Sequence, residues 1–255
     1  MAADPAAAWQ ALSGVRDPEL DESVTDLGFV TDLSVDGAGV VELSLRLPTY
    51  WCAPNFAYLM VDDAEVALSG VPGVTGARVR LVDHFAAEEI NAGVAARQGF
   101  AATFPGLAEG ELDELRTTFR RKALGRHQYL VCRAALDRGW GVEDLAGATL
   151  GDLPDDEEVR IYRDRRAELG IDASPGAAVL VDEEGRAVAA PAAAAHLSRL
   201  RLTTASIEGN GAWCRGLLET RYDGCWEGRP GAVTTTRVSL GARGPSRVER
   251  GGGPE

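Results

Sequence analysis

Residues 48–56 place a cysteine, Cys52, between an alternating apolar strand pattern and a helical pattern. Pro54 suits the first position of a helix, because its missing N–H costs nothing there. We therefore expect Cys52 beside the positive end of a helix dipole, among free backbone N–H groups. Such a position favours the thiolate, the form that attacks electrophiles and binds soft metals. The alternative is a small, buried apolar cysteine.

A second pair of candidate ligands lies further along the chain. His84 and Glu88 are four residues apart, so a helix over this stretch would place them on one face. Imidazole and carboxylate groups at this spacing suit iron or zinc. The alternative is an ordinary helix start with acidic residues in its first turn.

Cys214 lies in another cysteine-containing stretch, which also holds Cys225 and two tryptophans. Two cysteines eleven residues apart are a weak zinc signal, because zinc sites favour closer pairs. We expect a helix to begin near Cys214, which would give this thiol the same local environment as Cys52. Cys214 is therefore a candidate metal ligand. In the alternative, Trp213 and the leucines after it anchor this stretch onto the core.

Composition limits the class of protein. The chain has 255 residues, of which 45% are hydrophobic and 25% charged, as expected for a globular protein of one or two domains. The net charge of −13 argues against a nucleic-acid partner. We expect no membrane span and no secretory signal, because no run of 18 apolar residues occurs and the start lacks a basic region. Four cysteines without a short-spaced framework indicate reduced thiols in the cytoplasm.

The elements that position Cys52 form a compact α+β unit over residues 1–85. An Asp-Gly turn at residues 36–39 predicts a hairpin, and the second strand alternates apolar and polar residues. We expect a small sheet with helices on one face. The predicted elements are a helix over residues 5–13, strands over 29–35 and 41–47, a helix over 54–69 and a strand over 74–82.

Residues 86–227 are predicted to be a mainly helical extension. Long helices are expected over 111–138 and 155–169, with a short hairpin near 177–189 and an alanine-rich helix after it. Cys132 lies on an apolar helix edge and is expected to be packed. Residues 228–255 show no buried pattern, so we expect a disordered tail.

Several segments follow one another in a fixed order over residues 8–83. They are Asp17-Pro18-Glu19, Asp26-Leu27-Gly28, the hairpin strands, Thr49 and Cys52 before the second helix, and residues 68–74. This ordered set resembles the SufT/PaaD-like family of iron–sulfur cluster assembly factors. The resemblance implies a role in maturing iron or iron–sulfur proteins, with Cys52 as the functional cysteine, and it places Asp17, Glu19, Asp26 and Thr49 on the other signature positions.

Two features depart from the family pattern. The usual Cys-Pro is here Cys52-Ala53-Pro54, and about 170 residues follow the last strand. Long members of this kind resemble accessory proteins of bacterial di-iron monooxygenases. The acidic positions also have a simpler interpretation, since aspartate side chains often cap loops by accepting backbone hydrogen bonds.

Three functions follow from these residues. The first is a non-catalytic maturation factor in which Cys52, together with Cys214 and nearby acids, holds iron or a labile iron–sulfur cluster for a client metalloprotein or the assembly machinery. The second is a thiol enzyme with Cys52 as nucleophile and His84 as base. The third is a metal-free docking module. We expect the first, without nucleic-acid or membrane partners, and leave a homodimer open.

Overall fold

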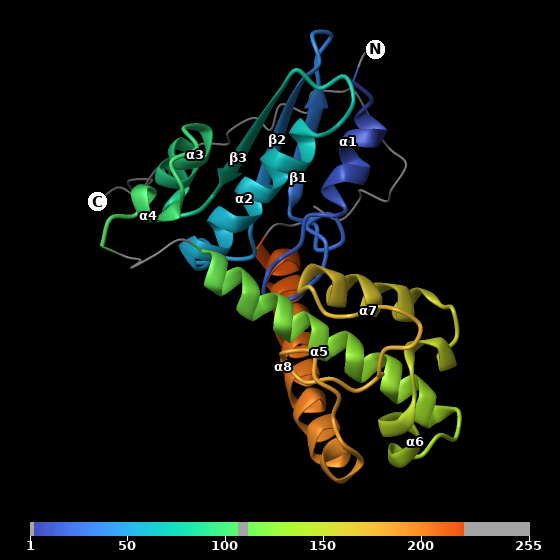
Figure 1. Ribbon diagram of the computed structural model, residues 1–255. Helices are drawn as coiled ribbons and strands as arrows, with labels where there is room; N and C mark the ends of the chain where they lie inside the picture. Colours follow the sequence, from blue (N-terminus) through green and yellow to red (C-terminus); the bar gives the residue numbers. More distant parts are fainter. Residues whose placement is uncertain (1–2, 107–111, 222–255) are drawn as a thin grey trace, which may run out of the picture.

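The computed structural model describes residues 3–106 and 112–221 (Figure 1). The first helix, α1 (Pro5–Leu12), begins as the sequence predicts. The carboxylate of Asp4 accepts a hydrogen bond from the backbone N–H of Ala6, and Pro5 occupies the first helical turn.

The sheet has three strands in the order β1–β2–β3, namely β1 (Val30–Val35), β2 (Val40–Arg46) and β3 (Gly76–Val82). β1 and β2 are antiparallel and joined by the predicted turn, in which Asp36 Oδ1 accepts hydrogen bonds from two backbone N–H groups. β2 and β3 are parallel, and α2 (Pro54–Ser69) connects them. Because β2 and β3 run in the same direction, their C-terminal ends lie at the same end of the sheet.

Helices cover one face of this sheet. Val41, Leu43 and Leu45 of β2 are buried, whereas Glu42 between them is exposed. The buried side chains share one apolar cluster with residues of α1, α2 and α3 (Ala87–Ala95). This confirms the predicted α+β architecture, in which a small sheet with helices on one face precedes a mainly helical region.

The apolar cluster around the sheet continues beyond the predicted boundary at residue 85. It includes Ile90 of α3, Phe100 of the short helix α4 (Phe100–Thr103) and Leu218 near the end of α8 (Ala190–Arg221). The division at residue 85 stays a prediction, but the hydrophobic contacts of the N-terminal part extend further along the chain.

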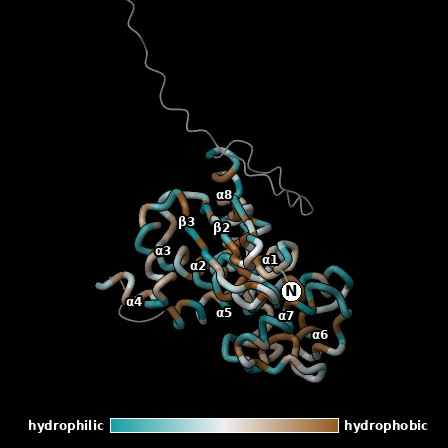
Figure 2. Tube along the Cα trace, turned by 90° about the horizontal axis from the view of Figure 1, so that it is seen from above, coloured by the Kyte–Doolittle hydropathy of each residue, from teal (hydrophilic) through white to brown (hydrophobic). Residues whose placement is uncertain are grey.

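The remaining helices surround a second apolar cluster, which includes Cys132 and Tyr162. Burial raises the pKa of the Cys132 thiol to about 12, in keeping with a packing role. Figure 2 shows apolar, brown segments near β2 and again near α6 and α7. The elements of this part are α5 (Asp113–Asp137), α6 (Val142–Gly147), a 3-10 helix (Leu150–Asp152), α7 (Glu157–Glu168) and α8.

The predicted hairpin near residues 177–189 is present and short. A single antiparallel bridge joins Val181 and Ala187, and Asp182 N donates to Arg186 O at 2.9 Å. None of the described helices is long and apolar enough to cross a membrane. The predicted disordered tail at 228–255 and Cys225 lie outside the described residues.

The expectation that a helix begins near Cys214 is wrong. α8 is continuous through Gly209 and Gly211, although two glycines this close together favour the end of a helix. A glycine inside a helix costs about 1 kcal/mol relative to alanine, and tertiary packing of α8 offsets this. Gly211 faces a neighbouring loop so closely that a Cβ atom there would lie 3.1 Å from Glu22 Oε1.

Candidate functional site

Cys52 lies between β2 and α2, where the sequence places it. It is half-buried and precedes Ala53, the residue at the N-terminal cap of α2. The sulfur is 3.2 Å from Thr49 Oγ1, and Thr49 Oγ1 also accepts a hydrogen bond from the backbone N–H of Trp51. Either atom can be the donor in the contact between the Thr49 hydroxyl and the Cys52 sulfur. When the sulfur is a thiolate, the hydroxyl is the group that donates.

His84 supports the Cys52 loop through backbone contacts. Its Nδ1 atom accepts a hydrogen bond from Ala86 N at 3.2 Å, which leaves the proton on Nε2. Nε2 then donates to the carbonyl oxygen of Cys52 at 2.8 Å. Burial lowers the pKa of His84, against the opposing effect of this hydrogen bond. His84 is therefore a neutral ring with both nitrogens engaged by the backbone, and it does not contact the thiol as a base would.

The expected pairing of His84 with Glu88 on one helix face is wrong. α3 begins at Ala87, so only Glu88 is helical, and His84 belongs to the turn before it. The His84 ring instead points to the Cys52 loop, where Nε2 bonds to the Cys52 carbonyl oxygen. Within the described ranges, no three His, Cys, Asp or Glu side chains are grouped so as to hold a metal ion. A metal role for this pair has no geometric support in that part of the chain.

Exposed aromatic side chains adjoin Cys52. Tyr50, Trp51 and Phe85 are 39%, 73% and 42% exposed, and we call them the aromatic patch. The ring centroids of Trp51 lie 4.9 Å from Tyr50 and 5.4 Å from Phe85. Phe85 N donates to Tyr50 O at 3.1 Å, which fixes the two loops together. The sequence indicated the pair before Cys52 but not Phe85, which the end of β3 brings to them.

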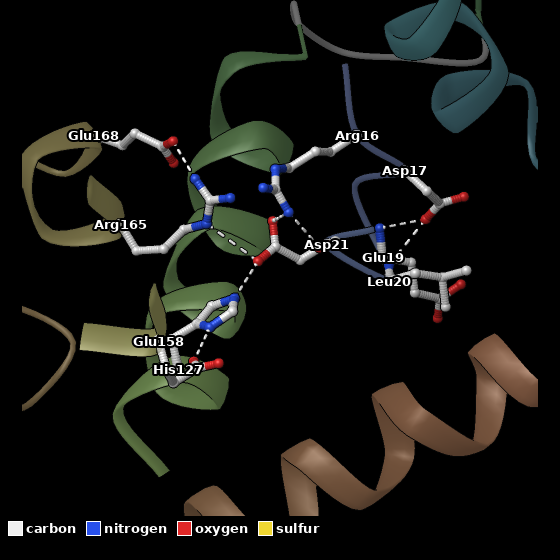
Figure 3. Close-up of polar contacts among 9 residues, drawn as sticks. All are labelled: Arg16, Asp17, Glu19, Leu20, Asp21, His127, Glu158, Arg165 and Glu168. Carbon is white, nitrogen blue, oxygen red and sulfur yellow. Dashed lines mark hydrogen bonds and ion pairs between the residues drawn. The ribbon is translucent and has the colours of Figure 1, made fainter. Parts of the chain in front are cut away.

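The acidic signature residues have different roles. Asp17 Oδ1 accepts hydrogen bonds from the backbone N–H groups of Glu19 and Leu20, both at 2.9 Å (Figure 3). This is the loop-capping arrangement considered above. Burial is the main reason that the pKa of Asp17 rises to about 6. Glu19 instead accepts a hydrogen bond from Asn210 of α8 at 3.1 Å, and Asp26 is exposed in the turn before β1.

Cys214 lies close to these residues although it is in the interior of α8. It is half-buried and packs, like Cys52, against the apolar cluster of the sheet. Burial raises the pKa of Cys214 to about 11, and the nearby negative charges of Asp17, Cys52 and Glu19 add to this effect. The structure therefore places two candidate site cysteines, Cys52 and Cys214, near two candidate acidic residues, Asp17 and Glu19.

The C-terminal end of α8 is held against the loops around Cys52. Arg215 Nη1 lies 2.6 Å from Glu22 Oε2. Arg221 Nη2 lies 3.2 Å from Asp83 Oδ2, and its Nη1 is 3.5 Å from the carbonyl oxygen of Pro48. Figure 1 shows the C-terminal end of α8 near the end of the sheet at which β2 and β3 finish.

A buried ionic network joins the signature loop to the helical region, and sequence reasoning missed it. His127 of α5 lies between two carboxylates, with Nε2 2.8 Å from Asp21 Oδ2 and Nδ1 hydrogen-bonded to Glu158 Oε1 (Figure 3). Arg165 Nε is 3.1 Å from Asp21 Oδ2, and Arg16 Nη1 is 3.5 Å from Asp21 Oδ1. No local signal could reveal this network, because its members lie on separate elements.

The charges of the network are set by its contacts. Burial alone would raise the pKa of Asp21, but the His127 hydrogen bond and the charges of Arg165 and Arg16 outweigh it and lower the pKa. Burial alone would lower the pKa of His127, but its hydrogen bonds to Asp21 and Glu158 outweigh burial and raise the pKa. His127 is thus an imidazolium that donates to both carboxylates.

Comparison with known proteins places the N-terminal part in a family. A model for iron–sulfur cluster assembly proteins matches residues 5–80. The Fe-S protein maturation auxiliary factor YitW of Bacillus subtilis is 33% identical over 72 residues, which are 28% of this chain and 69% of that protein. An uncharacterized protein of Methanocaldococcus jannaschii, MJ1129, is 31% identical over 81 residues, 32% of this chain and 83% of that protein.

The chain therefore belongs to the iron–sulfur cluster assembly protein family. This confirms the resemblance inferred from the residues around Asp17 and Cys52. The family match ends at residue 80, so α5 to α8 lie beyond it. The further resemblance to accessory proteins of di-iron monooxygenases stays a prediction.

Proposed function

We propose that this protein is a maturation factor that helps to insert iron or an iron–sulfur cluster into a client metalloprotein, with Cys52 as the thiol that contacts the cargo. The observation that carries the proposal is the position of Cys52. It is half-buried at the start of α2, its sulfur is 3.2 Å from the Thr49 hydroxyl, and both residues lie in the segment that matches the family model.

The geometry around Cys52 suits temporary binding. Thiolate is the usual protein ligand of cluster iron, and the Cys52 sulfur lies at the start of α2, beside a Thr49 hydroxyl that can donate to a thiolate. The described residues provide no closed set of three donors around this sulfur. Cargo held by so few ligands keeps open coordination positions, which a client can fill by ligand exchange. We propose that the protein acts in the cytoplasm, where its cysteines stay reduced.

The aromatic patch supports contact with the client. Tyr50 and Trp51 directly precede Cys52 in sequence, and Phe85 stacks beside them. Exposed aromatic residues often dominate protein–protein binding energy. A surface next to the thiol would bring the client's own ligands to the cargo. A di-iron monooxygenase is the first client to test. The aromatic patch could bind a client even if this protein carries no metal.

The thiol-enzyme alternative is weaker. A cysteine nucleophile needs a base within hydrogen-bond reach, and His84 was the best candidate. Both ring nitrogens of His84 instead bond to the backbone, one of them to the Cys52 carbonyl oxygen.

The test is maturation of the client by the wild type and by Cys52→Ser. We expect the variant to keep its circular dichroism spectrum and to lose maturation of the client. The matched control is Cys132→Ala, because that thiol is fully buried in the second apolar cluster. Full client activity with Cys52→Ser would overturn the proposal.

Iron and acid-labile sulfide, measured on protein purified without oxygen, separate the forms of cargo. Iron that is present in the wild type and absent in Cys52→Ser makes Cys52 a ligand. Sulfide in proportion to that iron indicates a cluster, and iron without sulfide indicates a mononuclear ion. Client maturation without bound metal in either sample would leave Cys52 as a contact to the client and would contradict the carrier role.

A further inference from the structure

We infer that Cys52 and Cys214 together form a two-thiol site for a soft divalent cation, in which α8 supplies the second sulfur from outside the family segment. The inference deepens the proposed function and rests on it for the biological use of the site. Its physical basis is the way in which α8 lies on the loops of the N-terminal part.

One face of α8 carries the contacts that orient Cys214. Asn210, Leu218 and Arg221 stand four residues before, four after and seven after Cys214, a spacing that shares one helix face. Each of the three touches the N-terminal part. Asn210 donates to Glu19, Leu218 is buried in the apolar cluster of the sheet, and Arg221 reaches the carbonyl oxygen of Pro48. Cys214 lies within this row and so faces the same loops.

Neither cysteine of the pair is fully buried or fully exposed. Cys52 and Cys214 are half-buried and pack at the border of the same apolar cluster. Cys132, by contrast, is fully buried in the other cluster and faces no such loop. A half-buried pair allows a cation to enter while limiting its hydration.

The charges near the pair favour a cation. Asn210, one turn before Cys214, donates to Glu19, and the backbone N–H of Glu19 donates to Asp17, so both acids belong to the loop that this face of α8 contacts. The cation beside Cys214, Arg215, is engaged by Glu22 at 2.6 Å. Negative groups around two sulfurs attract a positive ion and repel anions. Sulfur donors select soft or borderline metals, which include ferrous iron, zinc and cadmium.

The site would be open rather than structural. A structural zinc site uses four protein ligands, whereas the described residues offer no group of three. Two thiolates from this chain leave positions for sulfide or for ligands of the client. That composition suits a site from which metal is passed on.

The first experiment measures proximity directly in the full chain. A short fluorogenic reagent that links two thiols is added to the reduced protein, and the linked peptides are mapped by mass spectrometry. We expect a link between Cys52 and Cys214, and none to Cys132. Mapping separates this product from a link that involves Cys225. A Cys52–Cys225 product with no Cys52–Cys214 product would overturn the inference.

The second experiment measures binding of cadmium alone, by its thiolate charge-transfer absorbance, in wild type, Cys52→Ser, Cys214→Ser and Cys132→Ala. We expect one cadmium ion per chain, with affinity reduced by at least about tenfold in both site variants, since even the loss of outer-shell partners costs about 10–100-fold. Cys132→Ala should bind like the wild type. Unchanged affinity in Cys214→Ser would overturn the two-thiol site.

Client maturation distinguishes failure of this inference from failure of the proposed function. If Cys214→Ser keeps wild-type cadmium affinity while Cys52→Ser loses client maturation, the inference fails and the proposed function stands. If Cys52→Ser still matures the client, the proposed function fails whatever the cadmium affinities are. Circular dichroism of Cys214→Ser and Cys214→Ala checks that α8 remains folded.

Discussion

His127 of α5 and Asp21 of the loop after α1 are separated by 106 residues in sequence, yet His127 Nε2 lies 2.8 Å from Asp21 Oδ2. Side chains of both residues are nearly buried, at 4% and 9% exposed. Asp21 belongs to the segment that matches the assembly family, and His127 belongs to the extension. This contact therefore joins the two parts of the chain through charge rather than through apolar packing.

Removing the charge of Asp21 should destabilise the protein. Asp21→Asn leaves the buried cations of His127 and Arg165 without their shared carboxylate, and breaking a buried ion pair in this way costs about 3 kcal/mol or more. Asparagine tolerates the positive φ of 51° at this position, so backbone strain is not the cause. Urea unfolding measures the change. Asp26→Asn, at an exposed position, is the control, and a loss equal to that of the control would contradict the prediction.

Stability should also depend on pH through His127. Its pKa is raised in the folded protein, so its contribution is complete below the ordinary value of 6.5 and declines as pH rises through the raised value. Asp21 acts at the other end, since its lowered pKa means that its contribution is lost only in acid. We expect the free energy of unfolding to fall as the pH rises above 6.5 and through the raised pKa of His127, by about 1.4 kcal/mol for each unit of pKa shift.

The control for this pH dependence is His127→Gln, measured over the same range. His84 and His196 have lowered pKa values and remain in both proteins, so the difference between the two curves isolates His127. Parallel curves would show that His127 does not titrate as an ion-paired group.

Local signals in the sequence were sufficient for some elements. The bounds predicted for α2 match the structure, because Pro54 starts the helix and Gly70 follows its last residue. The same signals placed Cys52 at the junction with β2, where Thr49 contacts its sulfur. Strand β2 was recognised by its alternation, which the sheet preserves through one buried face.

Tertiary contacts decided what the sequence could not show. α8 continues through two glycines and contacts Glu19 and Glu22, which brings Cys214 near Cys52. The local sequence around Cys214 does not predict these contacts. Likewise His84 looked like a ligand or a base by residue type. Its actual partner is a backbone carbonyl oxygen 32 residues earlier, which only the packing of β3 beside the Cys52 loop defines.

The Thr49 hydroxyl should increase the reactivity of Cys52. Thr49→Val keeps the shape of the side chain and removes the group 3.2 Å from the sulfur. A hydrogen bond to a charged group contributes about 1.5 kcal/mol, so we expect alkylation of Cys52 by iodoacetamide at neutral pH to slow by about tenfold. Thr49→Ser retains the hydroxyl and should react like the wild type. Equal rates for the valine and serine variants would contradict a role for this contact.

His84 should act by holding the Cys52 loop rather than by proton transfer. Glutamine at this position keeps an N–H donor for the Cys52 carbonyl oxygen, whereas alanine removes it. We expect His84→Gln to mature the client nearly as well as the wild type and His84→Ala to be impaired. Complete loss of activity in both variants, together with a wild-type pH profile that follows a histidine, would instead favour the thiol enzyme.

The aromatic patch should contribute to client binding without contributing to folding. Trp51 is 73% exposed, so Trp51→Ala should change the free energy of unfolding by no more than about 0.5 kcal/mol. A tryptophan at the centre of an interface can contribute about 2 kcal/mol or more, which corresponds to a loss of about thirtyfold in client affinity. Trp213→Ala is the matched control, because this tryptophan on α8 is 70% exposed and lies outside the patch. Isothermal titration with the purified client compares them, and equal losses in both variants would show that the patch has no special part in recognition.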